Sequence, residues 1–314
     1  MILVGDIGGT HARLALADAD GGEIRIDRQQ VGPTPEDLPA LIRRYLDDQG
    51  IRTVAALALC GAGPTRDDGS IRLTNHPCVL EPASLGRAAG AGRVIVVNDF
   101  AAVAHAIPAL RQQDLLPCGG GQPVAGAPCV AIGAGTGLGI AALVAAGDDW
   151  VVVPGEGGHA DLAPVDDEEL AAWSVLRLRE GRISAEMVLS GRGLERLHNA
   201  VGGAVPLDAP YIARAAAQGD VSAARAVRLF TRWLGRVAGN ATLTVAARGG
   251  VYIAGGIVPA WGSSFDIAAF RAGFEDKAPF ADWLARIPAF VVLHPQPAFL
   301  GLARLALAGA LQRR

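Results

Sequence analysis

Lysine is almost missing from this chain: among 314 residues Lys277 is the only one, and arginine takes its place elsewhere. A P-loop needs Gly-Lys-Ser/Thr, and a protein kinase needs a strand lysine that contacts the phosphates, so both classes are excluded. A Schiff-base enzyme would depend on Lys277, whose Phe-Glu-Asp-Lys sequence is typical of a solvated charge cluster. Any phosphate must therefore be bound by backbone amides, hydroxyl groups, arginine and metal.

Other absences narrow the function further. The four cysteines (Cys60, Cys78, Cys118 and Cys129) have no C-x-x-C spacing, which argues against a zinc site or a redox pair. A net charge of −3 indicates no nucleic-acid partner, and the absence of G-x-S-x-G leaves a serine hydrolase unsupported. Glycine and proline interrupt the uncharged stretch 115–147, so we expect no membrane partner. With no signal-peptide pattern at the start, the predicted location is cytoplasmic.

A glycine turn close to the N-terminus carries the first functional signal. An apolar segment runs into Asp6-Ile7-Gly8-Gly9-Thr10, and a second apolar segment follows. Bare amides of Gly8 and Gly9, with the hydroxyl of Thr10, suit a phosphate chain. Asp6 is suited to hold Mg²⁺ through water, because Mg²⁺ favours a carboxylate together with substrate phosphates. The alternative is an ordinary hairpin turn.

Related glycine turns recur downstream. Gly135-Thr136-Gly137 follows an apolar segment as Gly9-Thr10 does, which indicates a duplicated fold that grips one phosphate chain from both sides. A third turn, Gly255-Gly256, is suited to pass beneath a nucleoside. The competing interpretation is a Rossmann oxidoreductase, since Gly137–Ala142 fits the alanine variant of the dinucleotide fingerprint with Glu156 downstream.

Two polar motifs are candidates for chemistry. Asn98-Asp99 ends an apolar strand, where ligands bind in open α/β sheets, so Asp99 is placed as a general base. The alternative for this pair is a helix N-cap. Glycines flank Glu156 and His159, whose carboxylate and imidazole suit vicinal sugar hydroxyls. The Glu-x-x-His spacing of di-iron bundles occurs there too, but Gly157-Gly158 disfavours the helix it requires.

The hydrophobic pattern predicts two α/β domains. We expect a small domain over 1–112, completed by a C-terminal helix at 299–314, and a large domain over 113–298, with a linker or hinge at 117–128. Strands are expected at 2–5, 12–18, 54–59, 71–75, 94–97, 129–133, 140–145, 150–153 and 251–254. Helices are expected at 35–49, 100–111, 167–179, 184–189, 193–200, 209–217, 220–246, 266–276 and 300–311.

The chain resembles the bacterial glucokinases of the proteobacterial type over essentially its whole length. The cysteine-rich zinc motif of the repressor/ORF/kinase type is absent. This resemblance implies the two-domain duplicated ribonuclease-H-like fold of the hexokinase/actin/Hsp70-type ATPases, with a cleft between the domains. The motifs that carry it, in order, are Asp6-Ile-Gly-Gly-Thr10, Asn98-Asp99-Phe100, Gly133-Ala-Gly-Thr-Gly-Leu-Gly139, Pro154-Gly-Glu-Gly-Gly-His159 and Ile253-Ala-Gly-Gly-Ile-Val-Pro259.

Similarity to this family implies a glucokinase that uses ATP and Mg²⁺ to make glucose 6-phosphate, commonly as a homodimer. Asp99 would be the base for the 6-hydroxyl of glucose. The sugar ligands implied are Asn98, Asp99, Glu156, His159 and Glu186. The nucleotide ligands implied are Asp6, Gly8, Gly9, Thr10, Gly135, Thr136, Gly137, Gly255 and Gly256.

Two positions depart from the family pattern. His11 stands where asparagine is usual, so it is assigned no role, and Cys78 replaces a common aromatic residue near Asn75, whose role stays open. The alternatives that remain are a kinase for another hexose such as mannose, another phosphoryl donor such as polyphosphate, or a non-catalytic sugar sensor on the same fold. Asp99 favours the enzyme, because a sensor needs no base beside the sugar.

Overall fold

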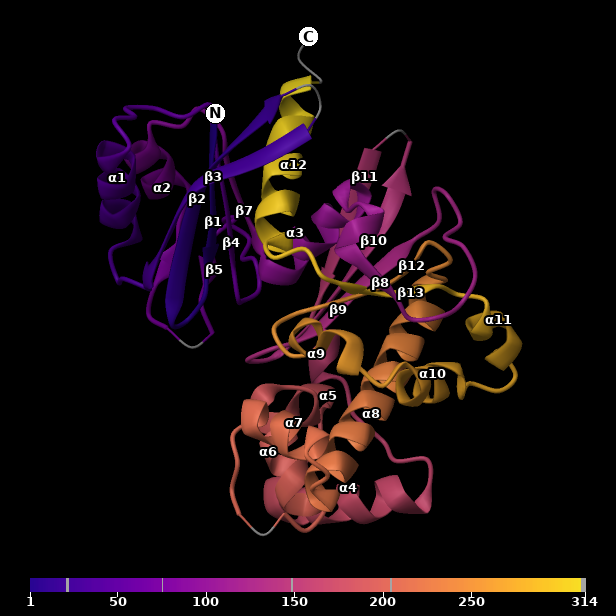
Figure 1. Ribbon diagram of the computed structural model, residues 1–314. Helices are drawn as coiled ribbons and strands as arrows, with labels where there is room; N and C mark the ends of the chain where they lie inside the picture. The colour runs from indigo at the N-terminus through magenta and orange to yellow at the C-terminus, as the bar shows by residue number, and fades with distance from the viewer. Residues whose placement is uncertain (21–22, 75, 148, 204, 312–314) are drawn as a thin grey trace. The chain divides into compact units, whose positions relative to one another are not determined.

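The structure is a computed structural model that describes residues 1–20, 23–74, 76–147, 149–203 and 205–311. The chain forms two compact units, each built from helices and one main sheet, which confirms the predicted mixed α/β class (Figure 1). Unit 1 contains Met1–Arg111 and His294–Arg314, and unit 2 contains Gln112–Leu293.

Unit 1 has a five-stranded sheet in the order β3-β2-β1-β4-β7. Strands β1, β4 and β7 are parallel, β2 is antiparallel to β1, and β3 is antiparallel to β2. Carboxyl ends of the three parallel strands therefore meet at one edge. The strands are β1 (Ile2–Ile7), β2 (His11–Asp20), β3 (Glu23–Pro33), β4 (Ala56–Gly61) and β7 (Val94–Asn98), and a separate hairpin is formed by β5 (Ile71–Arg72) and β6 (Val79–Leu80).

Alternate residues of the unit 1 strands pack into two apolar layers. Leu3 and Ile7 face one cluster, which includes residues of α1 (Leu38–Asp48) and α2 (Pro82–Ala89). Ile2 and Val4 face the other, with residues of α3 (Asp99–Ala106) and α12 (Pro297–Leu311). A Cβ on Gly301 of α12 would overlap the carbonyl oxygen of Ala102 in α3, so only glycine allows this close helix packing. The short turn η1 (Ile107–Ala109) follows α3.

Unit 2 has a six-stranded sheet in the order β11-β10-β9-β12-β13-β8. Its first five strands repeat the order and directions of the unit 1 sheet: β9, β12 and β13 are parallel, and β10 and β11 extend the sheet antiparallel. The strands are β8 (Leu115–Pro117), β9 (Cys129–Ala134), β10 (Leu138–Ala146), β11 (Asp149–Gly155), β12 (Gly250–Ala254) and β13 (Ala289–Val292).

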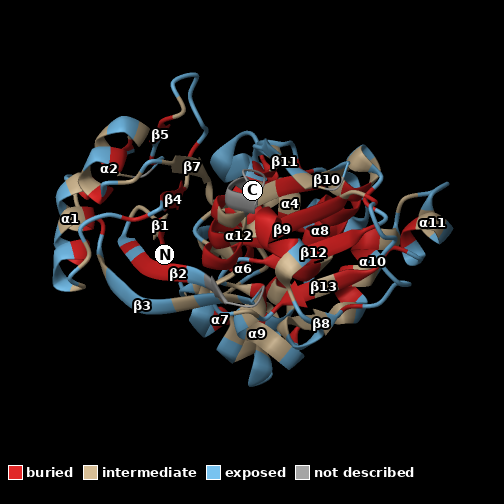
Figure 2. Ribbon diagram, turned by 90° about the horizontal axis from the view of Figure 1, so that it is seen from above, coloured by how far each residue is buried: buried red, intermediate tan, exposed pale blue. Residues whose placement is uncertain are grey.

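The long helix α8 (Val221–Val245) is the centre of the unit 2 core. Its Phe230, Trp233 and Leu234 are fully buried against residues of β9 and β12, and Figure 2 shows these elements largely in the colour of buried residues. The other helical elements are η2 (Gln112–Asp114), η3 (Gly157–His159), α4 (Asp167–Glu180), α5 (Ala185–Val188), α6 (Gly191–Ala200), α7 (Ala209–Ala217), α9 (Val258–Trp261), η4 (Gly262–Ser264), α10 (Ile267–Glu275) and α11 (Ala281–Ala285).

A buried carboxylate connects α4 to α8. Glu169 is fully buried; its Oε1 accepts hydrogen bonds from Nη2 of Arg232 at 2.7 Å and Nη2 of Arg236 at 2.9 Å. Its Oε2 accepts from the backbone N–H of Val165 at 3.0 Å. Arg236 also pairs with the exposed Asp276, with 3.1 Å between Nη1 and Oδ2. The contact between α4 and α8 is thus held by charges as well as by apolar packing.

The main sequence prediction that the structure corrects is the linker at 117–128. This segment is part of unit 2: β8 pairs with β13, and the backbone N–H groups of Cys118, Gly121 and Val124 donate to carbonyls of 289, 286 and 248. Its glycines and prolines shape a loop that pairs with distant segments. Most predicted elements are confirmed, including α8 within 220–246 and the strand at 94–97. Strands β3, β6, β8 and β13 and helices α2, α9 and α11 were not predicted. No helix in the described ranges is long and apolar enough to cross a membrane.

Candidate functional site

Asp6 lies near the end of β1, and its side chain is 28% exposed. Its Oδ1 accepts from the Cys60 thiol at 3.6 Å, and its Oδ2 lies 3.8 Å from Nη1 of Arg13. Burial raises the pKa of Asp6, while Arg13 and the Cys60 thiol act in the opposite direction. The carboxylate charge is therefore incompletely solvated, and a bound cation would stabilise it.

The first predicted turn connects β1 to β2. The Gly8 N–H donates to the carbonyl of His11 at 2.9 Å, which closes the turn. Thr34 stabilises the turn by two hydrogen bonds. Its hydroxyl donates to the Gly8 carbonyl at 2.6 Å, and its N–H donates to the Thr10 carbonyl at 3.1 Å. Thr10 is exposed and Gly8 and Gly9 are partly exposed, so the turn is open to a ligand. Nothing in the sequence around Thr34 signals this role.

Asn98 and Asp99 join β7 to α3, and both contact the first turn of the helix. Asn98 Oδ1 accepts from the N–H groups of Phe100 at 2.9 Å and Ala101 at 3.3 Å, while its Nδ2 donates to the Gly63 carbonyl at 3.2 Å. Asp99 Oδ1 accepts from the Phe100 N–H at 2.9 Å. Asn98 is therefore the N-cap, which was the alternative to a functional role, and Asp99 also contacts the helix terminus.

The Cys60 thiol connects the two acidic residues of unit 1. Cys60 lies in β4, opposite Asp6 of β1, and is fully buried. Burial raises the pKa of Cys60 well above its usual value, and the negative charges of Asp6 and Asp99 raise it further. The thiol is therefore an inert hydrogen-bond donor near both carboxylates, and the sequence did not single it out for this position.

The second and third predicted turns lie together at one edge of the unit 2 sheet. Gly135–Gly137 connects β9 to β10, and Gly255-Gly256 follows β12, which is parallel to β9. The Ile257 N–H donates to the Ala134 carbonyl at 3.2 Å. Gly255 has a φ of +83°, and a Cβ there would overlap Ala134, so only glycine permits this close approach.

The segment after the second turn contradicts the Rossmann interpretation. Leu138–Ala146 is a strand, antiparallel to β9, whereas a dinucleotide fingerprint requires a helix whose N-terminus faces the pyrophosphate. The match of 137–142 to the fingerprint is therefore a coincidence of glycine spacing. The hairpin presents backbone amides of its turn where a dinucleotide fold presents a helix N-terminus.

The predicted sugar residues of unit 2 come together around His159. Its Nε2 lies 4.0 Å from Oε2 of Glu156, and its Nδ1 lies 4.0 Å from Oε1 of Glu186. These contacts become ion pairs only when the imidazole is protonated. Glu156 and His159 have 58% and 59% exposed side chains and Glu186 34%. Two carboxylates and an imidazole thus face solvent from one place, as hydroxyl recognition requires.

Glycine fixes the loop that carries these residues. A Cβ on Gly158 would overlap the carbonyl oxygen of Leu138, so the loop packs directly on β10. The single turn η3 is too short for the helix that di-iron spacing needs. In the ranges described, no group of three or more histidine, cysteine or acidic residues is arranged to hold a metal ion.

The candidate residues thus form two groups. Unit 1 contributes Asp6, Gly8, Gly9, Thr10, Asn98 and Asp99, and unit 2 contributes Gly135, Thr136, Gly137, Glu156, His159, Glu186, Gly255 and Gly256. His11 is exposed beside the first turn, and Asn75 lies outside the described residues.

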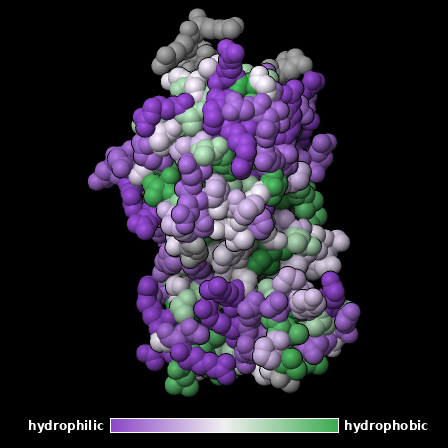
Figure 3. Space-filling model, turned by 90° about the vertical axis from the view of Figure 1, so that its left-hand side faces the viewer, coloured by the Kyte–Doolittle hydropathy of each residue, from purple (hydrophilic) through white to green (hydrophobic). Residues whose placement is uncertain are grey.

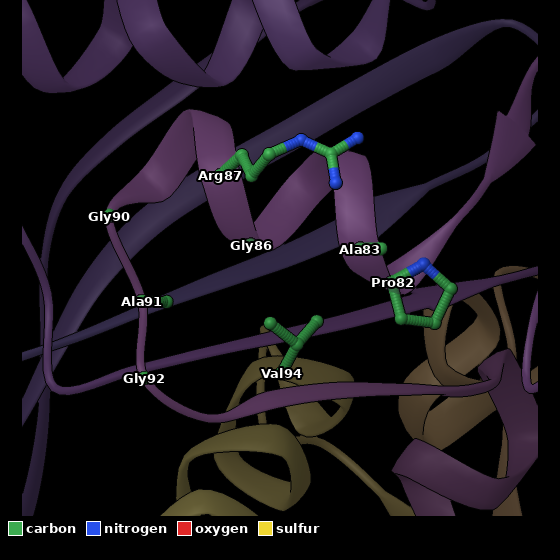
Figure 4. A pocket seen from close by; sticks show the side chains of 8 residues that line it. All are labelled: Pro82, Ala83, Gly86, Arg87, Gly90, Ala91, Gly92 and Val94. Atoms are coloured by element: carbon green, nitrogen blue, oxygen red, sulfur yellow. The ribbon is translucent and has the colours of Figure 1, made fainter.

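Two cavities are lined by residues outside these groups. One, of about 460 Å³, lies between α2 and the start of β7, where Val94 faces the helix and Arg87 is the only charged side chain (Figure 4). Another, of about 370 Å³, is lined by residues that include Arg236, Asp276 and Lys277. Hydrophobic residues on the face that Figure 3 shows appear in small separate groups. Neither cavity contains a predicted site residue.

A glucokinase family model matches residues 3–308. Glucokinases of Salmonella arizonae and Salmonella typhi are each 41% identical to this chain over 307 residues, covering 95% of it and 94% of each relative. The chain belongs to the glucokinase family. The sequence resemblance is thereby confirmed.

Solved structures agree with this family. A glucokinase from an Antarctic psychrotroph is 31% identical, has a TM-score of 0.86 and covers 98% of both chains. A glucokinase of Balamuthia mandrillaris, solved with glucose, is 24% identical with a TM-score of 0.79, covering 98% of this chain and 93% of its own. A ROK glucokinase of Streptomyces griseus, solved with glucose and AMPPNP, is 21% identical with a TM-score of 0.64, covering 98% of this chain and 100% of its own. The last two likenesses concern the fold alone.

Proposed function

We propose that this protein transfers the γ-phosphoryl group of ATP to the 6-hydroxyl of glucose, giving glucose 6-phosphate and ADP. The observation that carries the proposal is the grouping of Glu156, His159 and Glu186 in the same unit as two nucleotide-type glycine turns. Membership of the glucokinase family supports the reaction, and the glucose and AMPPNP in two related structures support the substrates.

Asp99 is the proposed general base. It follows the partly buried strand β7, and its negative charge raises the pKa of the same Cys60 thiol as that of Asp6 does. In phosphoryl transfer the protein chiefly positions the reactants and stabilises charge, and one carboxylate accepts the hydroxyl proton as the new bond forms. Asn98, already fixed as the cap of α3, would contribute a sugar contact from a rigid position.

Glu156, His159 and Glu186 are the proposed ligands of the remaining glucose hydroxyls. Two carboxylates accept hydrogen bonds, and the imidazole between them both donates and accepts. A site built to pair each hydroxyl rejects sugars that leave those groups unpaired. Membership of the glucokinase family supports glucose over another hexose such as mannose, and the AMPPNP in a related structure supports ATP over another donor such as polyphosphate.

Backbone turns replace the missing lysine as phosphate ligands in this proposal. Gly8, Gly9 and Thr10 of unit 1 and Gly135, Thr136 and Gly137 of unit 2 would bind the phosphates, with Gly255 and Gly256 beside the adenosine. The matching strand orders of the two sheets support a duplicated ribonuclease-H-like description. The cleft between the domains, and domain limits at 1–112 with 299–314 and 113–298, stay predictions.

Asp6 fits a role toward Mg²⁺. Burial raises the pKa of its incompletely solvated carboxylate. A carboxylate in this position would accept hydrogen bonds from water molecules that coordinate Mg²⁺. When bound with ATP, Mg²⁺ supplies charge neutralisation at the transferring phosphate. The homodimer and the cytoplasmic location also stay predictions from the sequence resemblance.

The test is a coupled assay of ADP formation with glucose, mannose and galactose, each with ATP or polyphosphate. Among these combinations, we expect efficient turnover only for the pair of glucose and ATP. The Asp99→Asn variant should bind glucose and yet turn over very slowly. Purified protein that forms no ADP with glucose, ATP and Mg²⁺ would exclude the proposed activity.

A further inference from the structure

The Glu186 carboxylate contacts two parts of unit 2. Its Oε2 accepts the backbone N–H of Leu138 at 2.9 Å, immediately after the Gly135–Gly137 turn. Its Oε1 faces Nδ1 of His159 at 4.0 Å. A residue with a role in sugar recognition alone has no need of the first contact.

The turn itself depends on the segment that carries Glu186. The Gly135 N–H donates to the Gly137 carbonyl at 2.8 Å, and the Gly135 carbonyl accepts from the Gly191 N–H at 2.8 Å. A Cβ on Gly137 would lie 2.5 Å from Oε2 of Glu186. The turn is therefore held on one side by the Gly191 amide and on the other by the Glu186 carboxylate.

The same segment is also fixed to the sugar loop. The Ala185 N–H donates to the carbonyl of Ala160, the residue after His159, at 2.9 Å. Ser184 caps α5 and forms an isolated β-bridge with Asp161. Glu186 therefore projects from a short segment whose backbone is hydrogen-bonded to both loops.

From these contacts we propose that Glu186 is a positioning residue for the phosphate-binding turn, in addition to its proposed sugar contact. Its hydrogen bond to the Leu138 amide orders the Gly135–Gly137 turn for the phosphates of ATP before sugar arrives. This inference rests on the proposed function, because it takes that turn to be a nucleotide ligand. A hydrogen bond of this kind changes an equilibrium by about 3–10-fold whether a carboxylate or an amide oxygen accepts it, which is enough to favour one conformation of a glycine turn.

The test compares three variants. Glu186→Ala removes both contacts, and Glu186→Gln retains an oxygen that accepts from Leu138 but loses the charge facing His159. Glu156→Ala is the control, because its carboxylate faces the other nitrogen of the same imidazole. MgADP affinity is measured by calorimetry in the absence of glucose. We expect about 3–10-fold weaker binding for Glu186→Ala, the loss of one hydrogen bond, and less than a twofold change for the other two.

A second readout needs no nucleotide. Hydrogen exchange of the Leu138 amide should be faster in Glu186→Ala than in the parent and nearly unchanged in Glu186→Gln and Glu156→Ala. Parent-like exchange and parent-like MgADP affinity in a folded Glu186→Ala would overturn the proposal, as would a Glu186→Gln that behaves like the alanine variant. Failure of the parent protein to bind MgADP would instead count against the proposed function. The exchange rates would still show whether Glu186 protects the Leu138 amide.

Discussion

Removal of the Glu169 carboxylate should destabilise unit 2 strongly. The carboxylate is fully buried and accepts hydrogen bonds from Val165, Arg232 and Arg236, while the Arg236 side chain is only 6% exposed. In Glu169→Leu the buried guanidinium of Arg236 keeps only the exposed Asp276. Breaking a buried pair from one side typically costs about 3–5 kcal/mol.

The expected loss lies in the lower part of that range, at about 3–4 kcal/mol. Arg232 keeps two carboxylate partners, Asp166 and Glu168, so only Arg236 loses its buried counter-charge. A loss of this size is a large fraction of the ~5–15 kcal/mol that holds a typical domain folded. Glu169→Gln should lose somewhat less stability, because its amide oxygen still accepts one hydrogen bond. Part of the loss remains, because the amide N–H group would face another donor.

Urea unfolding followed by tryptophan fluorescence measures this loss, because the buried Trp233 on α8 reports on unit 2. Glu168→Gln is the matched control: its partly exposed carboxylate pairs with Arg225, Arg228 and Arg232, and such partly exposed pairs each contribute about 0–1 kcal/mol. Replacing Glu169 and Arg236 together by leucine should recover much of the lost stability. A Glu169→Leu variant within 1 kcal/mol of the parent, or no worse than the control, would refute the reasoning.

Three further changes test other parts of the molecule. Asp99→Asn should lower kcat about 10²–10⁴-fold with little change in glucose affinity, whereas Glu156→Gln should chiefly raise KM. Steady-state rates and calorimetric titration of glucose distinguish the two effects. An Asp99→Asn variant that loses glucose binding but retains kcat would show that Asp99 is a sugar ligand and not the base. Gly301→Ala forces a Cβ into a backbone carbonyl and should lower the free energy of unfolding in urea by at least ~1–3 kcal/mol. The control Gly92→Ala, whose Cβ would enter open space, should be nearly neutral. Equal effects of the two substitutions would contradict the close packing of α12 on α3. Burial lowers the pKa of Lys277, so the native state binds this proton less tightly than the unfolded chain does. Lys277→Met should therefore be more stable than the parent at pH 7, with the difference narrowing as pH rises through the lowered native pKa; a less stable variant at pH 7 would show that the ammonium contributes a favourable contact.

Local sequence predicted the elements whose residues carry their own signal. The strand before Asn98-Asp99 and the long helix α8 have apolar patterns and caps that neighbouring residues reveal, and both are confirmed. Strand β3 was not predicted because Arg25, Asp27 and Gln29 leave it polar and largely exposed. It is a strand because β2 supplies a partner, which is a tertiary cause.

The site residues also divide into those that neighbouring sequence reveals and those that only tertiary contacts bring together. Glu156 and His159 are close in sequence, so their proximity followed from the motif, whereas Glu186 reaches them only through folding. Thr34 and Cys60 were not predicted because their contacts depend on strand register, which places Cys60 opposite Asp6. The linker prediction at 117–128 was wrong for a related reason: composition indicated a loop, but hydrogen bonds from Cys118, Gly121 and Val124 to distant carbonyls fix that loop within unit 2.

The position of α12 has a consequence for how the chain is made. Unit 2 is one continuous segment inserted into unit 1, and the last helix supplies Phe299, Leu302 and Ala303 to the apolar layer that also contains Ile2 and Val4. During synthesis, unit 2 emerges whole while the N-terminal sheet still lacks one of its covering layers. Unit 1 can bury that face only after α12 has left the ribosome, so strands made before unit 2 belong to a core that is completed after it.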